Sequence, residues 1–334
     1  MTTNKENFMR AVRNEETDGI PLYSMMWMYR YPAIYNESVG PDRVGFDYFG
    51  VEWYKGDNPT NASLPKPGAF ILDDITKWRD VIKVPDFVTG VDWGQMAKEH
   101  RDGLDPDNPM GIMTGPSVGF FQSLMSFMGF DEGLVACYEE PEEVKALMEY
   151  LTDWSCEMTK LAIQYYSPDI GYLCDDIAHE YNPFISTELF RELFAPAWRR
   201  YYATWLEAGI PVGMHNCGRF EPFVGDLIDM GVSFWDAVQS SNDIGAIKSN
   251  YNNGIILCAS PEGRFINEDE ITEESVKAEF EEWLDIAAPG GGLAMNEFLA
   301  NPPTEPWPGQ SEKMFLRTKW MAEVFAERRY GYYK

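Results

Sequence analysis

Residues 169–218 read DIGYLCDDIAHEYNPFISTELFRELFAPAWRRYYATWLEAGIPVGMHNCG, and their pattern of apolar side chains indicates the fold class. Its opening, 169–177, is a short apolar run typical of a buried strand. Residues 186–209 then carry apolar side chains at helical spacing, with Ser186 placed to cap the helix and Gly209 just past its end. A second apolar run follows at 211–218. Strand, helix and strand in this order predict a parallel βαβ unit.

The same alternation extends along most of the chain. Further strands are predicted at 18–27, 110–116, 233–239, 253–261 and 290–298. Further helices are predicted at 3–13, 119–128, 140–166, 272–287 and 310–328, with one more that ends at Met230. Because about seven or eight strands alternating with helices suit a closed sheet, we expect an α/β fold, a (β/α)8 TIM barrel. Residues 1–334 should form this single domain, with 37–100 as an irregular N-terminal elaboration packed on the barrel.

Composition limits the partners and the compartment. The chain has 334 residues, 45% of them hydrophobic, and a formal net charge of −27, so it should bury a core and repel nucleic acid and anionic membranes. The acidity serves solubility or, alternatively, the docking of a partner protein. No apolar stretch approaches the roughly 18 residues of a membrane span. The five cysteines are irregularly spaced, which predicts no disulfide framework and a cytoplasmic location.

No glycine-rich phosphate-binding motif follows a predicted strand, so nucleotide binding is not expected. In parallel barrels the active site lies at the C-terminal ends of the strands, and His215 and Cys217 lie at such an end. Residues two apart in an extended segment point to the same side, so this imidazole and thiolate converge as two zinc ligands would. The alternative is a hydrogen-bonded histidine beside an inert buried cysteine. Other polar residues at predicted strand ends are Asp236, Gln239, Cys258, Asn296 and Glu297.

Asp175 and Asp176 lie side by side at the end of the strand predicted at 169–177. Adjacent carboxylates at a strand end can hold a substrate or act as acid and base, and His179 is a further acid–base candidate. The alternative is a loop acid that caps the following segment. Cys174 should point away from Asp175 and is predicted to be a core residue.

The segment SMMWMYRYPAIY, residues 24–35, is unusually rich in Met and aromatic side chains. Met26, Trp27 and Arg30 are therefore predicted to line a substrate pocket for an apolar or aromatic ligand. Plain packing against the N-terminal elaboration is the alternative interpretation.

Four segments of the chain together resemble the uroporphyrinogen-decarboxylase-like superfamily. They are the opening 4–24, the block 174–200, HNCG at 215–218, and the closing GG and NPPTEP between 291 and 306. They occur in the family's order and spread over the whole chain, so the resemblance implies the family's barrel fold.

True decarboxylases of this superfamily carry an arginine-rich MRQAGR-type segment that binds the substrate's carboxylates. The corresponding segment here, MMWMYRYPAIY, contains only Arg30, so decarboxylation of a porphyrinogen or another acid is the less favoured alternative. HNCG is similar to the HxCG motif of the superfamily's zinc-dependent, corrinoid-linked methyltransferases. That resemblance implies zinc, a small-molecule methyl donor, and a corrinoid protein as the partner that accepts the methyl group. A homodimer is left open.

The sequence departs from the thiol-activating pattern in two places. In the similar cobalamin-independent methionine synthase, a glutamate ligand follows the motif cysteine by 22 residues, where Gln239 stands in this chain. A further cysteine is expected near Leu299, but none lies beyond Cys258. Glu297 or Cys258 is therefore predicted to complete a variant zinc site, unless the metal has been lost.

A zinc ion with more oxygen and nitrogen ligands is a stronger Lewis acid than one held by thiolates. This favours a methyl donor such as an aromatic methoxy compound. Gln239 and Asn296 are predicted to contact it. A non-catalytic barrel that binds a ligand or a corrinoid protein is the third interpretation.

Overall fold

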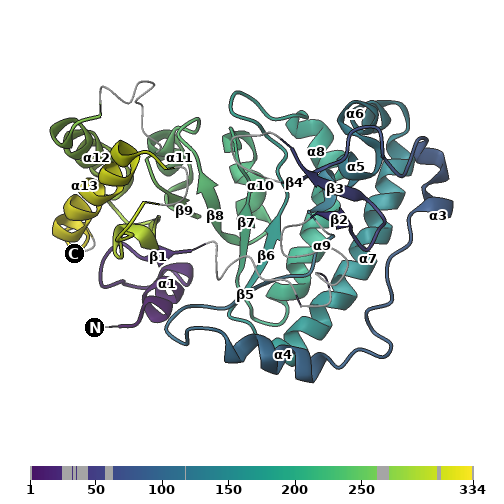
Figure 1. Cartoon of the computed structure of the whole chain (residues 1–334), viewed down its shortest axis with the longest axis horizontal. Coiled ribbons are helices and arrows are strands. Elements are labelled where there is room, and N and C mark those ends of the chain that lie inside the picture. Colours follow the sequence, from purple (N-terminus) through teal and green to yellow (C-terminus); the bar gives the residue numbers. More distant parts are fainter. Residues whose placement is uncertain are drawn as a thin grey trace.

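The computed structural model describes residues 2–24, 32, 35, 44–56, 63–116, 118–261, 271–306 and 310–332. Within them the chain builds a seven-stranded sheet in which all neighbouring strands are parallel, in the order β1-β10-β9-β8-β7-β6-β5 (Figure 1). The strands are β1 (Leu22–Tyr23), β5 (Gly111–Met113), β6 (Ile170–Cys174), β7 (Val212–His215), β8 (Val232–Val238), β9 (Ile256–Ala259) and β10 (Leu293–Asn296). All seven predicted strands are confirmed, and each except β8 is shorter than its apolar run.

The expectation of a closed eight-stranded barrel is wrong for the described part of the chain. The seven strands curl into a half-barrel whose edges are β1 and β5, and no described strand joins these two edges. The sequence pattern could not show this, because strand–helix alternation fixes parallel pairing but leaves closure to the strand number and tilt.

Helices connect the strands, as the alternation predicted. They are α1 (Asn4–Val12), α3 (Trp78–Val81), α4 (Trp93–Asp102), α5 (Phe120–Met128), α6 (Phe130–Glu139), α7 (Pro141–Tyr166), α8 (Thr187–Leu193), α9 (Ala195–Leu206), α10 (Val224–Asp229), α11 (Ile244–Tyr251), α12 (Glu273–Ala287) and α13 (Glu312–Arg328). The sequence had not indicated α3, α4, α6 and α11. The helix predicted over 186–209 is two helices, because Pro196 stands in the first turn of α9 and has no N–H to continue the hydrogen bonds of α8.

Side chains alternate between the two faces of the curled sheet. Those of the outer face pack against the helices in the larger hydrophobic core. They include Leu173, Met214, Trp235, Leu257 and Met295. Those of the inner face form a smaller core with Tyr172, Phe234 and Ile256, into which α1 inserts Phe8. The Phe8 and Phe234 rings meet edge to face with centroids 5.4 Å apart. This inner core lies beneath the C-terminal strand ends and gives them a rigid base.

The N-terminal elaboration is more regular than predicted. It contains a three-stranded antiparallel sheet formed by β2 (Gly45–Phe46), β3 (Glu52–Lys55) and β4 (Ser63–Pro65). Buried Asp47 stabilises its first turn by accepting hydrogen bonds from the backbone N–H of Phe49 and Val51 and from the indole of Trp53. Strands of two to four residues are too short to show periodicity, so the sequence could not reveal them.

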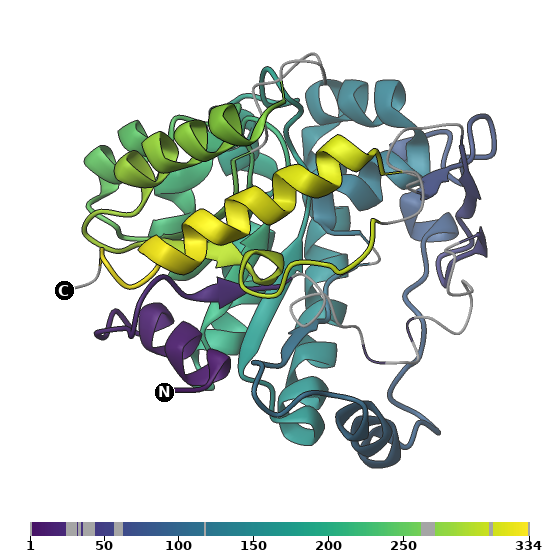
Figure 2. The ribbon, with the colours of Figure 1, turned by 60° about the vertical axis from the view of Figure 1, so that its left-hand side comes forward.

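Helix α13 runs beside α12, and its C-terminal end reaches the start of β1 (Figure 2). The carbonyl of Arg329 accepts a hydrogen bond from the N–H of Ile20, and the Arg329 side chain donates to the carbonyl of Ile20. Elements at opposite ends of the sequence thus hold the β1 edge. None of the described helices has the length and apolarity needed to cross a membrane.

Gly213 makes room for the inner core. A Cβ atom built there would lie 2.0–2.6 Å from three atoms of the Phe234 ring, which packs on Phe8 and Tyr172. We therefore expect Gly213→Ala to lower the free energy of unfolding by about 1–3 kcal/mol, measured by urea denaturation. Gly103→Ala is the control, since its Cβ would meet only a carbonyl at 3.7 Å. Equal stability of the two variants would contradict this view of the inner core.

Candidate functional site

The ends of β6, β7 and β8 place three polar side chains in one row. Parallel pairing sets Cys174 opposite His215, and His215 opposite Asp236. Residues in register on neighbouring strands point to the same face, so the three side chains lie side by side above the inner core. His215 and Asp236 are buried, whereas Cys174 is half-buried.

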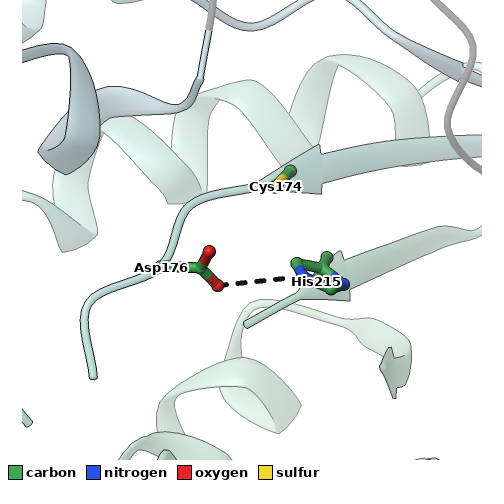
Figure 3. Close-up of side chains that lie close together, drawn as sticks. All are labelled: Cys174, Asp176 and His215. Atoms are coloured by element: carbon green, nitrogen blue, oxygen red, sulfur yellow. Dashed lines mark ion pairs between the residues drawn. The ribbon is translucent and has the colours of Figure 1, made fainter. Parts of the chain in front are cut away.

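Asp176 completes a cluster of metal-ligand type. One ligand atom each of Cys174, Asp176 and His215 lie within 4.8 Å of one another (Figure 3). His215 Nε2 is 3.8 Å from Asp176 Oδ1. That oxygen also accepts a hydrogen bond from the N–H of Cys217 at 2.7 Å, which fixes the carboxylate over the β7 end. The prediction that Cys174 is a core residue is confirmed only in part: it packs on the inner core, but it is half-buried and its thiol also belongs to this cluster.

His215 and Cys217 converge, as their spacing predicted. The Sγ of Cys217 lies 3.4 Å from Nε2 of His215, the same nitrogen that faces Asp176. Cys217 therefore stands next to the three-residue cluster and offers a further thiol on its Nε2 side.

Asp236 contacts the other nitrogen of His215. Its Oδ1 lies 3.3 Å from Nδ1 and also accepts a hydrogen bond from the hydroxyl of Tyr172. Burial lowers the pKa of His215, but the negative charges of Cys174 and Asp236 raise it well above its ordinary value. The sequence placed Asp236 at a strand end, but only the register of β7 and β8 shows that it serves His215.

Asp175 has surroundings unlike those of its neighbour. Its carboxylate is fully buried and accepts hydrogen bonds from the first three N–H groups of α5, those of Phe120, Phe121 and Gln122, and from the indole of Trp198. Burial raises the pKa of Asp175 to about 7, against the lowering effect of these four bonds. The carboxylate acts as a cap for a helix whose own N-cap residue, Gly119, has no side chain to do so. A catalytic role for Asp175 stays a prediction.

His179 and Gln239 surround the loop that follows β7. The carbonyl of His179 accepts a hydrogen bond from the N–H of Arg219, and Gln239 Oε1 accepts one from the N–H of Gly218. The His179 ring is exposed and packs against Tyr181 and Phe184. Both residues thus lie at the rim beside the cluster, and their predicted roles in catalysis and substrate binding stay predictions.

The other predicted site residues lie elsewhere. Cys258 is fully buried in the inner core, and burial raises the pKa of its thiol well above the ordinary value. Asn296 caps the short turn Glu297–Leu299 by accepting a hydrogen bond from the N–H of Phe298. Among the residues that the structure describes, neither Cys258 nor Glu297 joins a metal-ligand cluster. Met26, Trp27 and Arg30 lie outside the described residues.

The cluster fits a zinc ion in both chemistry and spacing. Thiolate, imidazole and carboxylate are the ligands that zinc takes, and bonds of roughly 2.0–2.3 Å in a tetrahedron put ligand atoms about 3.3–3.8 Å apart. Within the cluster, the 3.8 Å between Nε2 of His215 and Oδ1 of Asp176 agrees with this spacing. So does the 3.4 Å from the same nitrogen to the Sγ of Cys217, which lies beside the cluster. In addition, the buried Oδ2 of Asp236 has no hydrogen-bond partner among the residues that the structure describes. A cation nearby would offset the negative charge that these acids and thiols concentrate.

Comparison with known proteins identifies relatives at the level of family and fold. The model of the family described as uroporphyrinogen decarboxylase (URO-D) matches residues 94–301. Among solved structures, a methyltransferase from Methanosarcina mazei superimposes with a TM-score of 0.60 at 15% identity, covering 98% of this chain and 100% of that one. At this identity the likeness concerns the fold. No curated protein matches the chain.

The adjacent acids should respond differently to the same substitution. Asp175→Asn puts an amide N–H2 group against buried N–H donors, so we expect the free energy of unfolding to fall by about 3 kcal/mol. Asp176 is partly exposed, and Asp176→Asn should cost less than about 1 kcal/mol. Urea denaturation in the presence of a zinc chelator measures both without any contribution from metal. A larger loss for Asp176→Asn would refute the assignment of Asp175 to helix capping.

Proposed function

Because this chain belongs to the uroporphyrinogen decarboxylase family, we propose that it is an enzyme of that family's methyltransferase kind, with zinc at the ends of β6 and β7. The observation that carries the proposal is the cluster of Cys174, Asp176 and His215. A decarboxylase of this family does not need a cluster of metal ligands, whereas a methyltransferase can use a metal to activate the methyl donor. The likeness in fold to a methyltransferase from Methanosarcina mazei adds support.

The proposed ligand set differs from the one expected from the sequence. Cys174, Asp176 and His215 would hold the zinc, and the Cys217 thiol beside Nε2 of His215 is a candidate fourth ligand. Cys174 and Asp176 replace Cys258 and Glu297, which the structure does not bring to the cluster. One oxygen and one nitrogen ligand keep the set less electron-rich than a site built of thiolates alone.

Zinc bound here would act as a Lewis acid toward the oxygen of a methyl ether, which favours an aromatic methoxy donor. The methyl carbon would be attacked by the cobalt of a corrinoid protein, the C–O bond would break, and its electron pair would stay on oxygen. His179, exposed at the rim and outside the cluster, would supply the proton that the leaving oxygen needs. Gln239 accepts a hydrogen bond from the N–H of Gly218 and so fixes the loop at residues 217–218. The Cys217 thiol would therefore keep its position beside the methyl donor.

Zinc content separates the two ligand sets. We expect the purified protein to hold about one zinc ion per chain, and Cys174→Ser, Asp176→Asn and His215→Ala each to lose most of it, since a catalytic site with three protein ligands tolerates little loss. Cys258→Ala and Glu297→Gln are the matched controls and should keep zinc. Elemental analysis after dialysis gives the measurement. Retention of zinc by His215→Ala would end the metal hypothesis.

Substrate turnover separates the two activities of the family. Decarboxylation of uroporphyrinogen needs cationic groups for the substrate's carboxylates, and this chain has a net charge of −27 with only Arg30 in segment 24–35. We expect no coproporphyrinogen from uroporphyrinogen, but methylation of a cob(I)alamin-bearing protein by a methoxylated aromatic compound. Product analysis on one zinc-loaded preparation tests both, with His215→Ala as the inactive control. Formation of coproporphyrinogen would instead identify the protein as a decarboxylase.

A further inference from the structure

We propose that Tyr172 and Asp236 are positioning residues that decide which nitrogen of His215 faces the metal cluster. This inference rests on the proposed zinc site and adds two residues to it. A neutral imidazole carries its proton on one ring nitrogen and offers a lone pair on the other. A hydrogen-bond acceptor beside the first nitrogen therefore leaves the second nitrogen free to bind the metal. In many metal sites a carboxylate plays this part.

The contacts of His215 assign the two nitrogens. Nδ1 lies 3.3 Å from Oδ1 of Asp236, and Nε2 faces Asp176 at 3.8 Å and Cys217 at 3.4 Å. A proton on Nδ1 donated to Asp236 leaves the lone pair of Nε2 directed toward the other donors. The opposite tautomer would leave a buried carboxylate facing a lone pair, which is unfavourable.

Tyr172 in turn fixes Asp236. Its hydroxyl donates to Oδ1 of Asp236, the same oxygen that meets His215. Its ring stacks on Phe234 with centroids 6.0 Å apart and an interplanar angle of 19°, and its carbonyl accepts a hydrogen bond from the Tyr201 hydroxyl at 2.9 Å. Tyr172 and Asp236 are both fully buried, so the hydroxyl has little freedom to turn away. A tyrosine two residues before Cys174 thereby orients a ligand on the next strand.

Zinc affinity of the full-length protein tests the inference. Loss of outer partners of a ligating histidine typically costs 10- to 100-fold in metal affinity. We expect Asp236→Asn to weaken zinc binding by about 10- to 100-fold and Tyr172→Phe by about tenfold, measured by competition with a chromophoric chelator. Tyr172→Phe keeps the buried ring, so it stays informative if Asp236→Asn folds poorly.

Two control variants match these changes in burial and chemistry. Tyr202 is another fully buried tyrosine, and its hydroxyl contacts the sulfur of Met214. Asp47 is a buried carboxylate with three donors in the β2–β3 turn. Tyr202→Phe and Asp47→Asn should leave zinc affinity within about twofold of the wild-type value, because neither side chain touches the His215 network.

A spectroscopic readout reports on the tautomer itself. The chain has three histidines, so long-range 1H–15N spectra of the zinc-loaded protein can be assigned with the His100→Gln and His179→Gln variants. We expect the proton of His215 on Nδ1. A proton on Nε2, or wild-type zinc affinity in both Tyr172→Phe and Asp236→Asn, would overturn the positioning role. Absence of zinc binding by the wild-type protein would instead refute the proposed function.

Discussion

The row formed by Cys174, His215 and Asp236 depends on the parallel register of β6, β7 and β8. Each strand contributes one side chain at the same level, and the inner core of Phe8, Tyr172 and Phe234 holds that level from below. A shift of one residue in any of these strands would turn its polar side chain to the outer face, among the helices. The site thus inherits its geometry from the packing beneath it.

The alternation of side chains along a strand predicted those contacts that form within one strand. The convergence of His215 and Cys217 follows from their spacing alone, and 3.4 Å between their ligand atoms confirms it. Cys174 and Asp236 could not be assigned in this way, because their contacts with His215 cross between strands and depend on register. Nor could the open half-barrel be predicted, since strand–helix alternation is the same in an open and a closed sheet.

Asp175 and Asp176 are adjacent and chemically identical, but at the end of β6 their side chains enter different surroundings. Alternation sends Asp175 outward to the N-terminus of α5 and Asp176 inward to His215. The outward acid is enclosed and accepts four hydrogen bonds, which suits a structural cap. The inward one keeps partial exposure and stands beside two sulfur atoms and an imidazole. The sequence suggested capping and catalysis as roles for this pair, but it could not say which acid has which role. That assignment depends on where α5 and β7 lie relative to the end of β6.

Gln239 explains how the proposed ligand set could differ from that of methionine synthase while the loop after β7 keeps its shape. It stands where methionine synthase has a ligating glutamate, and here its amide oxygen accepts the N–H of Gly218. A neutral amide in this role fixes the loop after β7 but brings no charge to a metal. In the proposed zinc site the carboxylate would come instead from Asp176, just past the end of β6, whose Oδ1 accepts a hydrogen bond from the N–H of Cys217. Because all these side chains project from strand ends onto one rim, a donor lost from one strand can be replaced from its neighbour without moving the backbone.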